Sequence, residues 1–205
     1  MRYFKTPILF KKWQPSLIWH LKSDTSIYLT FDDGPDPEVT PWVLNELKKF
    51  NAQATFFFLG KNIDQHLEIG KSVVSAGHQL GNHTYNHMKG WKTDTDAYAN
   101  DVDACDEALR RIGQESILFR PPYGKINKTQ VRNLKTRKII MWSHSAYDFD
   151  ADLDIRSSIR NLKKARPGSI VVFHDSQKAW RNLKQILPEL LNHYHSRGFK
   201  FDPIP

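Results

Sequence analysis

Short apolar runs alternate along the chain with longer segments in which apolar residues recur every three or four positions. The runs at residues 54–59 (ATFFFL) and 170–173 (IVVF) show no regular alternation of apolar and polar residues. This is typical of strands that are buried on both faces of a sheet. Strands are predicted at residues 27–31, 54–59, 78–80, 117–119, 138–142, 169–173 and 198–201.

The segments between these strands have helical periodicity. After the first strand, Leu44, Leu47 and Phe50 recur at helical spacing. Thr40 is predicted to cap this helix, with Pro41 at its first position, where a missing N–H costs nothing. Further helices are predicted at residues 63–74 (ended by Gly77), 95–112, 125–136, 153–164 and 179–196.

Strands that alternate with helices predict a parallel sheet or a barrel. Six or seven such units in 205 residues lie at the lower end of the length of (β/α) barrels, about 200 residues. The sequence therefore predicts one domain over residues 1–205 with a reduced or distorted barrel. Residues 1–26 are predicted to form an N-terminal extension that packs on it. The alternative is an open, doubly wound sheet.

The composition is that of a soluble globular domain, with 40% hydrophobic and 25% charged residues. No apolar run approaches the ~18 residues that a membrane span needs. A single cysteine, Cys105, excludes an internal disulfide framework and a multi-cysteine zinc site. The 30 basic and 22 acidic residues give a net charge of +8, but the basic residues are spread along the chain. This pattern does not favour a nucleic-acid groove.

The first residues do not resemble a secretory signal. The apolar run at residues 7–10 is interrupted by Lys11 and Lys12. It is shorter than the apolar core of a signal peptide, about 7–15 residues. The sequence therefore predicts a cytoplasmic location, with the cell envelope as the alternative.

Unusual polar residues lie just after four of the predicted strands. In parallel α/β folds, the carboxyl ends of the strands meet at one face, where active sites form. Residues that are far apart in the sequence are therefore expected to meet there. They are Asp32 and Asp33, His83 and His87, Arg120, and His174 and Asp175.

Two histidines and an aspartate would provide three ligands for a metal ion. His83 and His87 are four residues apart, so one helical turn would place both imidazoles on one side. Thr84 follows His83, which excludes the H-E-x-x-H motif of zinc proteases. Three ligands leave a coordination position open, as in catalytic zinc sites. The same ligands also occur in non-haem iron enzymes, so they do not fix the reaction. An Asp-rich turn and a chance pair of histidines are the structural alternatives.

Two further segments carry candidate catalytic residues. In the segment Arg120-Pro121-Pro122-Tyr123-Gly124, Arg120 could pair with an Asp carboxylate. The rigid loop could direct the Tyr123 N–H towards a developing oxyanion. His174, at the end of a buried strand, could be a general acid. A structural salt bridge and a hydrogen-bonded structural histidine are the alternatives.

Together these segments resemble the polysaccharide deacetylase family (carbohydrate esterase family 4). The motifs are TFDDGP at residues 30–35, HTYNH at 83–87, RPPYG at 120–124 and IVVFHD at 170–175. The resemblance covers about residues 28–201. It implies a distorted (β/α) barrel with about seven parallel strands. It also implies hydrolysis of N-acetyl groups on an N-acetylglucosamine-containing glycan, with release of acetate.

The resemblance also implies a role for each motif residue. Asp33, His83 and His87 would bind one divalent metal ion, usually Zn²⁺ and sometimes Co²⁺ or another ion. Asp32 would be the catalytic base and His174 the catalytic acid. Arg120 would pair with the base, and the Tyr123 N–H would bind the oxyanion. Trp142 and Val172 would line an acetyl pocket, or would simply belong to the core.

One segment departs from the family pattern. Ser145 stands where members commonly have an Asp that positions or tunes the catalytic histidine, and Asp148 matches a second acidic position. The partner of His174 is therefore open at this point. Two other functions remain as alternatives. One is an amide hydrolase for small non-sugar substrates, whose members often alter the first motif, which is intact here. The other is a catalytically weakened protein that binds a glycan or an anionic polymer.

Overall fold

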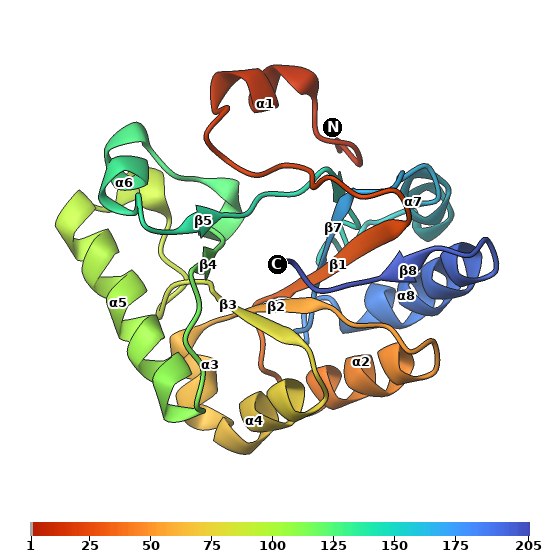
Figure 1. Cartoon of the computed structure of the whole chain (residues 1–205), viewed down its shortest axis with the longest axis horizontal. Helices are drawn as coiled ribbons and strands as arrows, with labels where there is room; N and C mark the ends of the chain where they lie inside the picture. Colours follow the sequence, from red (N-terminus) through yellow and green to blue (C-terminus); the bar gives the residue numbers. More distant parts are fainter. Residues whose placement is uncertain (1) are drawn as a thin grey trace.

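The computed structural model describes residues 2–205 and is built around a sheet of eight strands (Figure 1). Seven strands follow the order β5-β4-β3-β2-β1-β7-β6, with parallel neighbours, and β8 pairs with β1 outside this path. The strands are β1 Ser26–Asp32, β2 Thr55–Phe58, β3 Gln79–Asn82, β4 Leu118–Phe119, β5 Lys138–Ile139, β6 His144–Ser145, β7 Ile170–His174 and β8 Lys200–Phe201.

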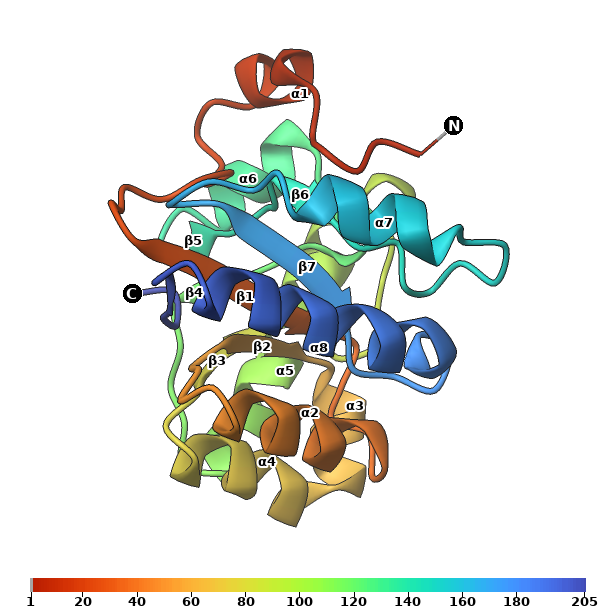
Figure 2. The same ribbon diagram turned by 90° about the vertical axis from the view of Figure 1, so that its right-hand side faces the viewer.

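Most helices surround the sheet on its outer side, whereas α1 stands apart near the N-terminus (Figures 1 and 2). They are α1 Ile8–Trp13, α2 Val39–Lys48, α3 Gly60–Gln65, α4 Leu67–Ser75, α5 Thr95–Arg111, α6 Lys128–Asn133, α7 Ile155–Leu162 and α8 Trp180–His195. Two short 3-10 turns, Gly90–Lys92 and Pro122–Gly124, follow β3 and β4.

The side chains of β1 alternate between two environments, as strand geometry requires. Leu29 and Phe31 pack in the main core beneath the helices, where the Phe31 ring stacks 5.0 Å from Phe56 and 5.7 Å from Phe173. Asp32 therefore points to the opposite side, into the curved interior of the sheet. The same strand thus supplies core packing on one face and a carboxylate on the other.

The predicted distorted barrel of about seven parallel strands is confirmed as a curled, incompletely closed barrel, and the open doubly wound alternative is wrong. Strands β5 and β6 end the sheet, and the N-terminal segment lies across the gap between them. The Ile18 N–H donates to Ile139 O (2.9 Å), and the Met141 N–H donates to Ile18 O (2.7 Å). On the other side, the Thr6 N–H donates to Ser143 O (2.9 Å). The extension therefore supplies backbone hydrogen bonds that a closing strand would otherwise make.

Two predicted helices differ from the structure. Thr40 does not cap α2, because the helix begins at Val39 and Thr40 lies inside it; the Thr40 hydroxyl accepts the Asp36 N–H (2.8 Å) and donates to Asp175 (2.6 Å). The helix predicted over residues 63–74 is two helices, α3 and α4, because the backbone leaves helical geometry at His66 (φ −137°). Gly77 follows α4 with a φ of 83°, a conformation that favours glycine. The short elements α1 and β6 were not predicted.

Candidate metal centre and active site

A cavity of about 520 Å³ opens at the carboxyl ends of the strands. Its walls come from the end of β1, the loops after β3 and β4, the segment around β6, and the end of β7. Of the nine site residues that the sequence predicts, only Arg120 does not line this cavity. The others are Asp32, Asp33, His83, His87, Tyr123, Trp142, Val172 and His174. The structure therefore brings four separate motifs to one place.

The side chains of Asp33, His83 and His87 converge on a small volume within the cavity. Asp33 Oδ1 lies 3.2 Å from His87 Nε2 and 3.6 Å from His83 Nε2. Ligands bonded to a tetrahedral zinc ion at 2.0–2.2 Å are themselves about 3.3–3.6 Å apart. Asp33 Oδ1 is buried and makes no hydrogen bond with any described residue. These residues therefore fit a divalent cation, which would give that oxygen a partner.

Both imidazoles are held in the form that can bind a metal. His83 Nδ1 lies 2.7 Å from Arg120 O. A proton on Nδ1 donated to this carbonyl leaves the Nε2 lone pair directed towards Asp33. Burial lowers the pKa of His83 to about 3 and also lowers the pKa of His87. Both rings are therefore neutral near pH 7, as metal ligation requires.

The prediction that one helical turn aligns the two histidines is wrong. His83 and His87 lie in the irregular loop after β3, and His87 has a φ of 61°. The buried side chain of Asp101, from α5, fixes this loop: its Oδ2 accepts the N–H groups of Tyr85 and Asn86 (both 3.0 Å). The imidazoles therefore meet through a loop that a distant helix holds in place. The sequence spacing alone gave no signal for Asp101.

Arg120 lies fully buried behind the cavity. Its Nη1 donates to Asp32 Oδ1 and to Thr30 Oγ1 (both 2.7 Å). Its Nε and Nη2 donate to the carbonyl oxygens of Ile140 (3.1 Å) and Met141 (3.2 Å). A buried guanidinium is tolerated only where its charge and its N–H groups are paired in this way.

The Arg120 contact leaves one oxygen of Asp32 for chemistry. Oδ1 is occupied by the guanidinium, while Oδ2 lies 4.0 Å from His83 Nε2. Asp32 is only 3% exposed, so its side chain is fixed by packing as well as by the ion pair. Oδ2 is thereby directed towards the site that Asp33 and the two imidazoles surround.

Asp148 is the partner of His174 that the sequence left open. Asp148 Oδ1 lies 2.7 Å from His174 Nδ1, and Oδ2 accepts the His174 N–H (2.8 Å). Burial lowers the pKa of His174, but the charge and hydrogen bond of Asp148, with the charges of Asp33 and Asp32, outweigh it and raise the pKa to about 9. Ser145 lines the cavity without replacing this contact. The second acidic position of the segment was the signal for Asp148.

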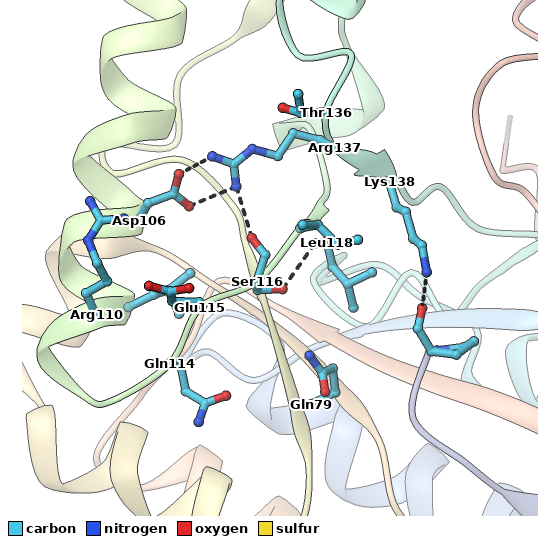
Figure 3. A pocket seen from close by; sticks show the side chains of 13 residues that line it. Gln79, Asp106, Arg110, Gln114, Glu115, Ser116, Leu118, Thr136, Arg137 and Lys138 are labelled. Carbon is cyan, nitrogen blue, oxygen red and sulfur yellow. Dashed lines mark hydrogen bonds and ion pairs between the residues drawn. The ribbon is translucent and has the colours of Figure 1, made fainter.

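Another cavity lies at the amino-terminal ends of β4 and β5 (Figure 3). The ion pair of Arg137 with Asp106 crosses it, and Lys138 Nζ donates to Pro205 O (2.9 Å). None of the predicted catalytic or metal-ligating residues lines this cavity. The candidate chemistry is therefore confined to the opposite end of the barrel.

Comparison with known proteins agrees with this geometry. The model of the polysaccharide deacetylase family matches residues 21–139, more than half of the chain. The chain belongs to the polysaccharide deacetylase family. The family resemblance that the four motifs indicate is therefore confirmed.

Several deacetylases of this family are similar over most of the chain. A peptidoglycan-N-acetylglucosamine deacetylase of Bacillus cereus is 32% identical over 95% of this chain and 94% of its own length. A chitooligosaccharide deacetylase of Azorhizobium caulinodans is 29% identical over 90% of this chain and 95% of its own length. A solved peptidoglycan N-acetylglucosamine deacetylase has a TM-score of 0.88, with 30% identity, and covers 96% of this chain and 94% of its own.

Other relatives are longer than this chain. It spans 66% of another Bacillus cereus deacetylase and 39% of one from Listeria monocytogenes. Within residues 2–205, no helix combines the length and the apolar character that crossing a membrane requires.

Proposed function

We propose that the protein is a metal-dependent hydrolase that removes N-acetyl groups from an N-acetylglucosamine-containing glycan and releases acetate. The observation that carries this proposal is the convergence of two neutral imidazoles on the buried, unpartnered oxygen of Asp33. The named substrates of the relatives are consistent with a peptidoglycan-like or chitooligosaccharide-like glycan.

Asp33, His83 and His87 would hold the metal ion. One carboxylate oxygen and two imidazole nitrogens suit zinc, and cobalt or another divalent ion could replace it. A divalent cation bound there supplies Lewis acidity, which lowers the pKa of water and polarises a carbonyl. Three protein ligands leave room for substrate and water.

Asp32 and His174 would move the protons of the reaction. Asp32 Oδ2, held towards the cavity by the Arg120 ion pair, would accept a proton from the attacking water. Water oxygen bonds to the acetyl carbon, and the bond from that carbon to nitrogen breaks. Asp148 occupies His174 Nδ1, so Nε2 is the atom that would protonate the departing nitrogen. The products are acetate and a free amine.

Backbone and apolar groups complete the proposed site. The Tyr123 N–H would donate to the oxyanion, an interaction typically worth about 3–4 kcal/mol in the transition state. Tyr123 has a φ of 59°, which sets the backbone direction of the turn after β4. Trp142 and Val172 line the same cavity and would contact the acetyl methyl group.

The test is acetate release by purified protein on chitooligosaccharides and peptidoglycan fragments. We expect turnover that stops when a chelator removes the metal and returns when zinc is added. A metal-loaded protein that binds these glycans without releasing acetate would instead be a glycan-binding member of the family. The absence of turnover on every N-acetylated sugar would contradict the proposed activity.

The Asp148→Asn variant is expected to move the alkaline limit of activity to lower pH. A general acid must be protonated, so kcat falls as pH rises through the pKa of His174, about 9 in the absence of a bound cation. A bound cation offsets the charges of Asp32 and Asp33, so the alkaline limit of kcat then lies at a lower pH than this pKa. Without the Asp148 charge, burial becomes the dominant influence on the pKa of His174 and lowers it. The alkaline limit of kcat should therefore move towards pH 6.5 or below, roughly two units lower.

The measurement is kcat against pH for the wild-type protein and the variant. Asp150→Asn is the matched control, because Asp150 lies two residues away and pairs with Arg2 outside the cavity. Its profile should match that of the wild type. An unchanged alkaline limit in Asp148→Asn would show that Asp148 does not set the pKa of the catalytic acid.

A further inference from the structure

Helix α1 carries the two most exposed large apolar side chains that the structure describes. Leu9 is 79% exposed and Ile8 is 69% exposed, and Phe10 beside them is 49% exposed. Among the described residues, none of the three belongs to a hydrophobic core cluster or packs against one. The core therefore gives no reason for apolar side chains here. Adjacent exposed apolar residues mark a surface that contacts a partner or a membrane.

Helix α1 projects from the barrel on a fixed base. Both views show it at an outer edge of the molecule, apart from the other helices (Figures 1 and 2). Before the helix, the Thr6 N–H donates to Ser143 O (2.9 Å). After the helix, Ile18 O accepts the Met141 N–H (2.7 Å). Backbone hydrogen bonds thus tie both ends of the projecting segment to the barrel, so the fold sets the direction in which α1 points.

The charge of the N-terminal segment has one sign. Residues 2–23 contain no Asp or Glu and five of the 30 basic residues, so they account for most of the net charge of +8. Arg2 pairs with Asp150. Lys5 and Lys12 are exposed and form no ion pair with any acidic side chain that the structure describes. The exposed apolar residues of α1 therefore stand between two free positive charges.

We propose that α1 docks the protein on the surface of a lipid bilayer that contains anionic lipids. Ile8, Leu9 and Phe10 would enter the boundary between the headgroups and the acyl chains. Lys5 and Lys12 would contact the anionic headgroups. Lysine suits this position, because its aliphatic stem lies along an apolar surface while its ammonium group stays in water. This inference does not depend on the proposed function, because an inactive protein with the same helix would dock in the same way.

A second copy of the chain fits this surface less well than an anionic bilayer. Twofold symmetry would bring the same patch of both copies together. The lysines of the two segments would then face each other, and residues 2–23 offer no acidic side chain to separate them. Like charges across an interface oppose association. An anionic bilayer instead has the charge that this segment lacks.

Co-sedimentation of the full chain with lipid vesicles tests the proposal. The protein should bind vesicles that contain phosphatidylcholine and phosphatidylglycerol in equal amounts, and it should bind vesicles of phosphatidylcholine alone much more weakly. Added salt should weaken binding to the mixed vesicles, because it screens the attraction between lysine and lipid headgroups. A protein that does not bind the mixed vesicles would overturn the proposal.

The variant Ile8→Ser/Leu9→Ser tests the apolar contact. It should lower the partition coefficient on the mixed vesicles about tenfold to hundredfold, because two apolar side chains no longer enter the bilayer. Its melting temperature should be unchanged, since neither side chain packs in the core. Ile117→Ser is the matched control, because Ile117 is 54% exposed but lines the cavity of Figure 3, and it should bind like the wild type. Equal binding by the double variant and the wild type would show that α1 does not dock.

The variant Lys12→Glu tests the charge. It should lower the partition coefficient on the mixed vesicles about tenfold. Lys48→Glu changes the net charge equally and is the matched control, because Lys48 is exposed at the end of α2, on the opposite side of the molecule from α1 (Figure 1). Equal losses in the two variants would overturn the proposal in favour of a general attraction by net charge. So would a wild-type dimer in solution that Ile8→Ser/Leu9→Ser dissociates, because a second copy of the chain would then cover α1.

Discussion

Replacing Asp32 by Asn should lower kcat for acetate release by a factor of about 10²–10⁴, the usual contribution of a positioned general base. An amide has nearly the same shape as a carboxylate, but it does not accept the proton of the attacking water. The loss should appear in kcat at saturating substrate. Zinc content should be retained, because Asp33, His83 and His87 are unchanged.

The control for Asp32→Asn must distinguish a loss of kcat that comes from the missing base from one that comes from a less stable fold. Asp32 pairs with the buried Arg120, and breaking a buried ion pair costs about 3–5 kcal/mol when one partner is removed. Thr30→Val removes a different partner of the same guanidinium, 2.7 Å from its Nη1. Both variants should melt at lower temperature, but only Asp32→Asn should lose catalysis on this scale. A comparable loss of kcat in Thr30→Val would contradict the role of Asp32 as base.

Replacing His87 by Ala should abolish zinc binding and reduce acetate release to background. Two protein ligands would remain, fewer than the three that catalytic zinc sites use. The measurement is the zinc content of protein dialysed against low concentrations of zinc, together with its activity. His195→Ala is the control, because His195 is exposed near the end of α8 and contacts only the Phe50 ring among the described aromatic rings. Stoichiometric zinc in His87→Ala would show that the ion binds elsewhere.

The sequence predicts most of the sheet because its central strands are buried on both faces. Residues 54–59 and 170–173 are apolar without alternation, and they form β2 and β7. Strand β6 has only two residues, and α1 has six. Elements this short carry no periodic pattern. Strand β6 is defined by its parallel pairing with β7, and Lys5 of the N-terminal segment adds an isolated bridge to His144.

Part of the candidate site could be predicted from the positions of the strands. Asp33, His83 and His174 each stand at or near the end of a strand, so the topology of a parallel sheet brings them to one face. The local geometry could not be predicted. His83 and His87 meet through a loop held by Asp101, and His174 takes its partner from a residue 26 positions away. Such contacts depend on how distant segments pack.

Anomalous X-ray diffraction from a crystal grown with zinc would test the central claim most directly. The account predicts one strong peak at the zinc absorption edge, about 2.0–2.2 Å from Asp33 Oδ1, His83 Nε2 and His87 Nε2. It also predicts that a coordination position facing the cavity is open to water or substrate. A zinc-saturated crystal with no peak between these three atoms would contradict the account.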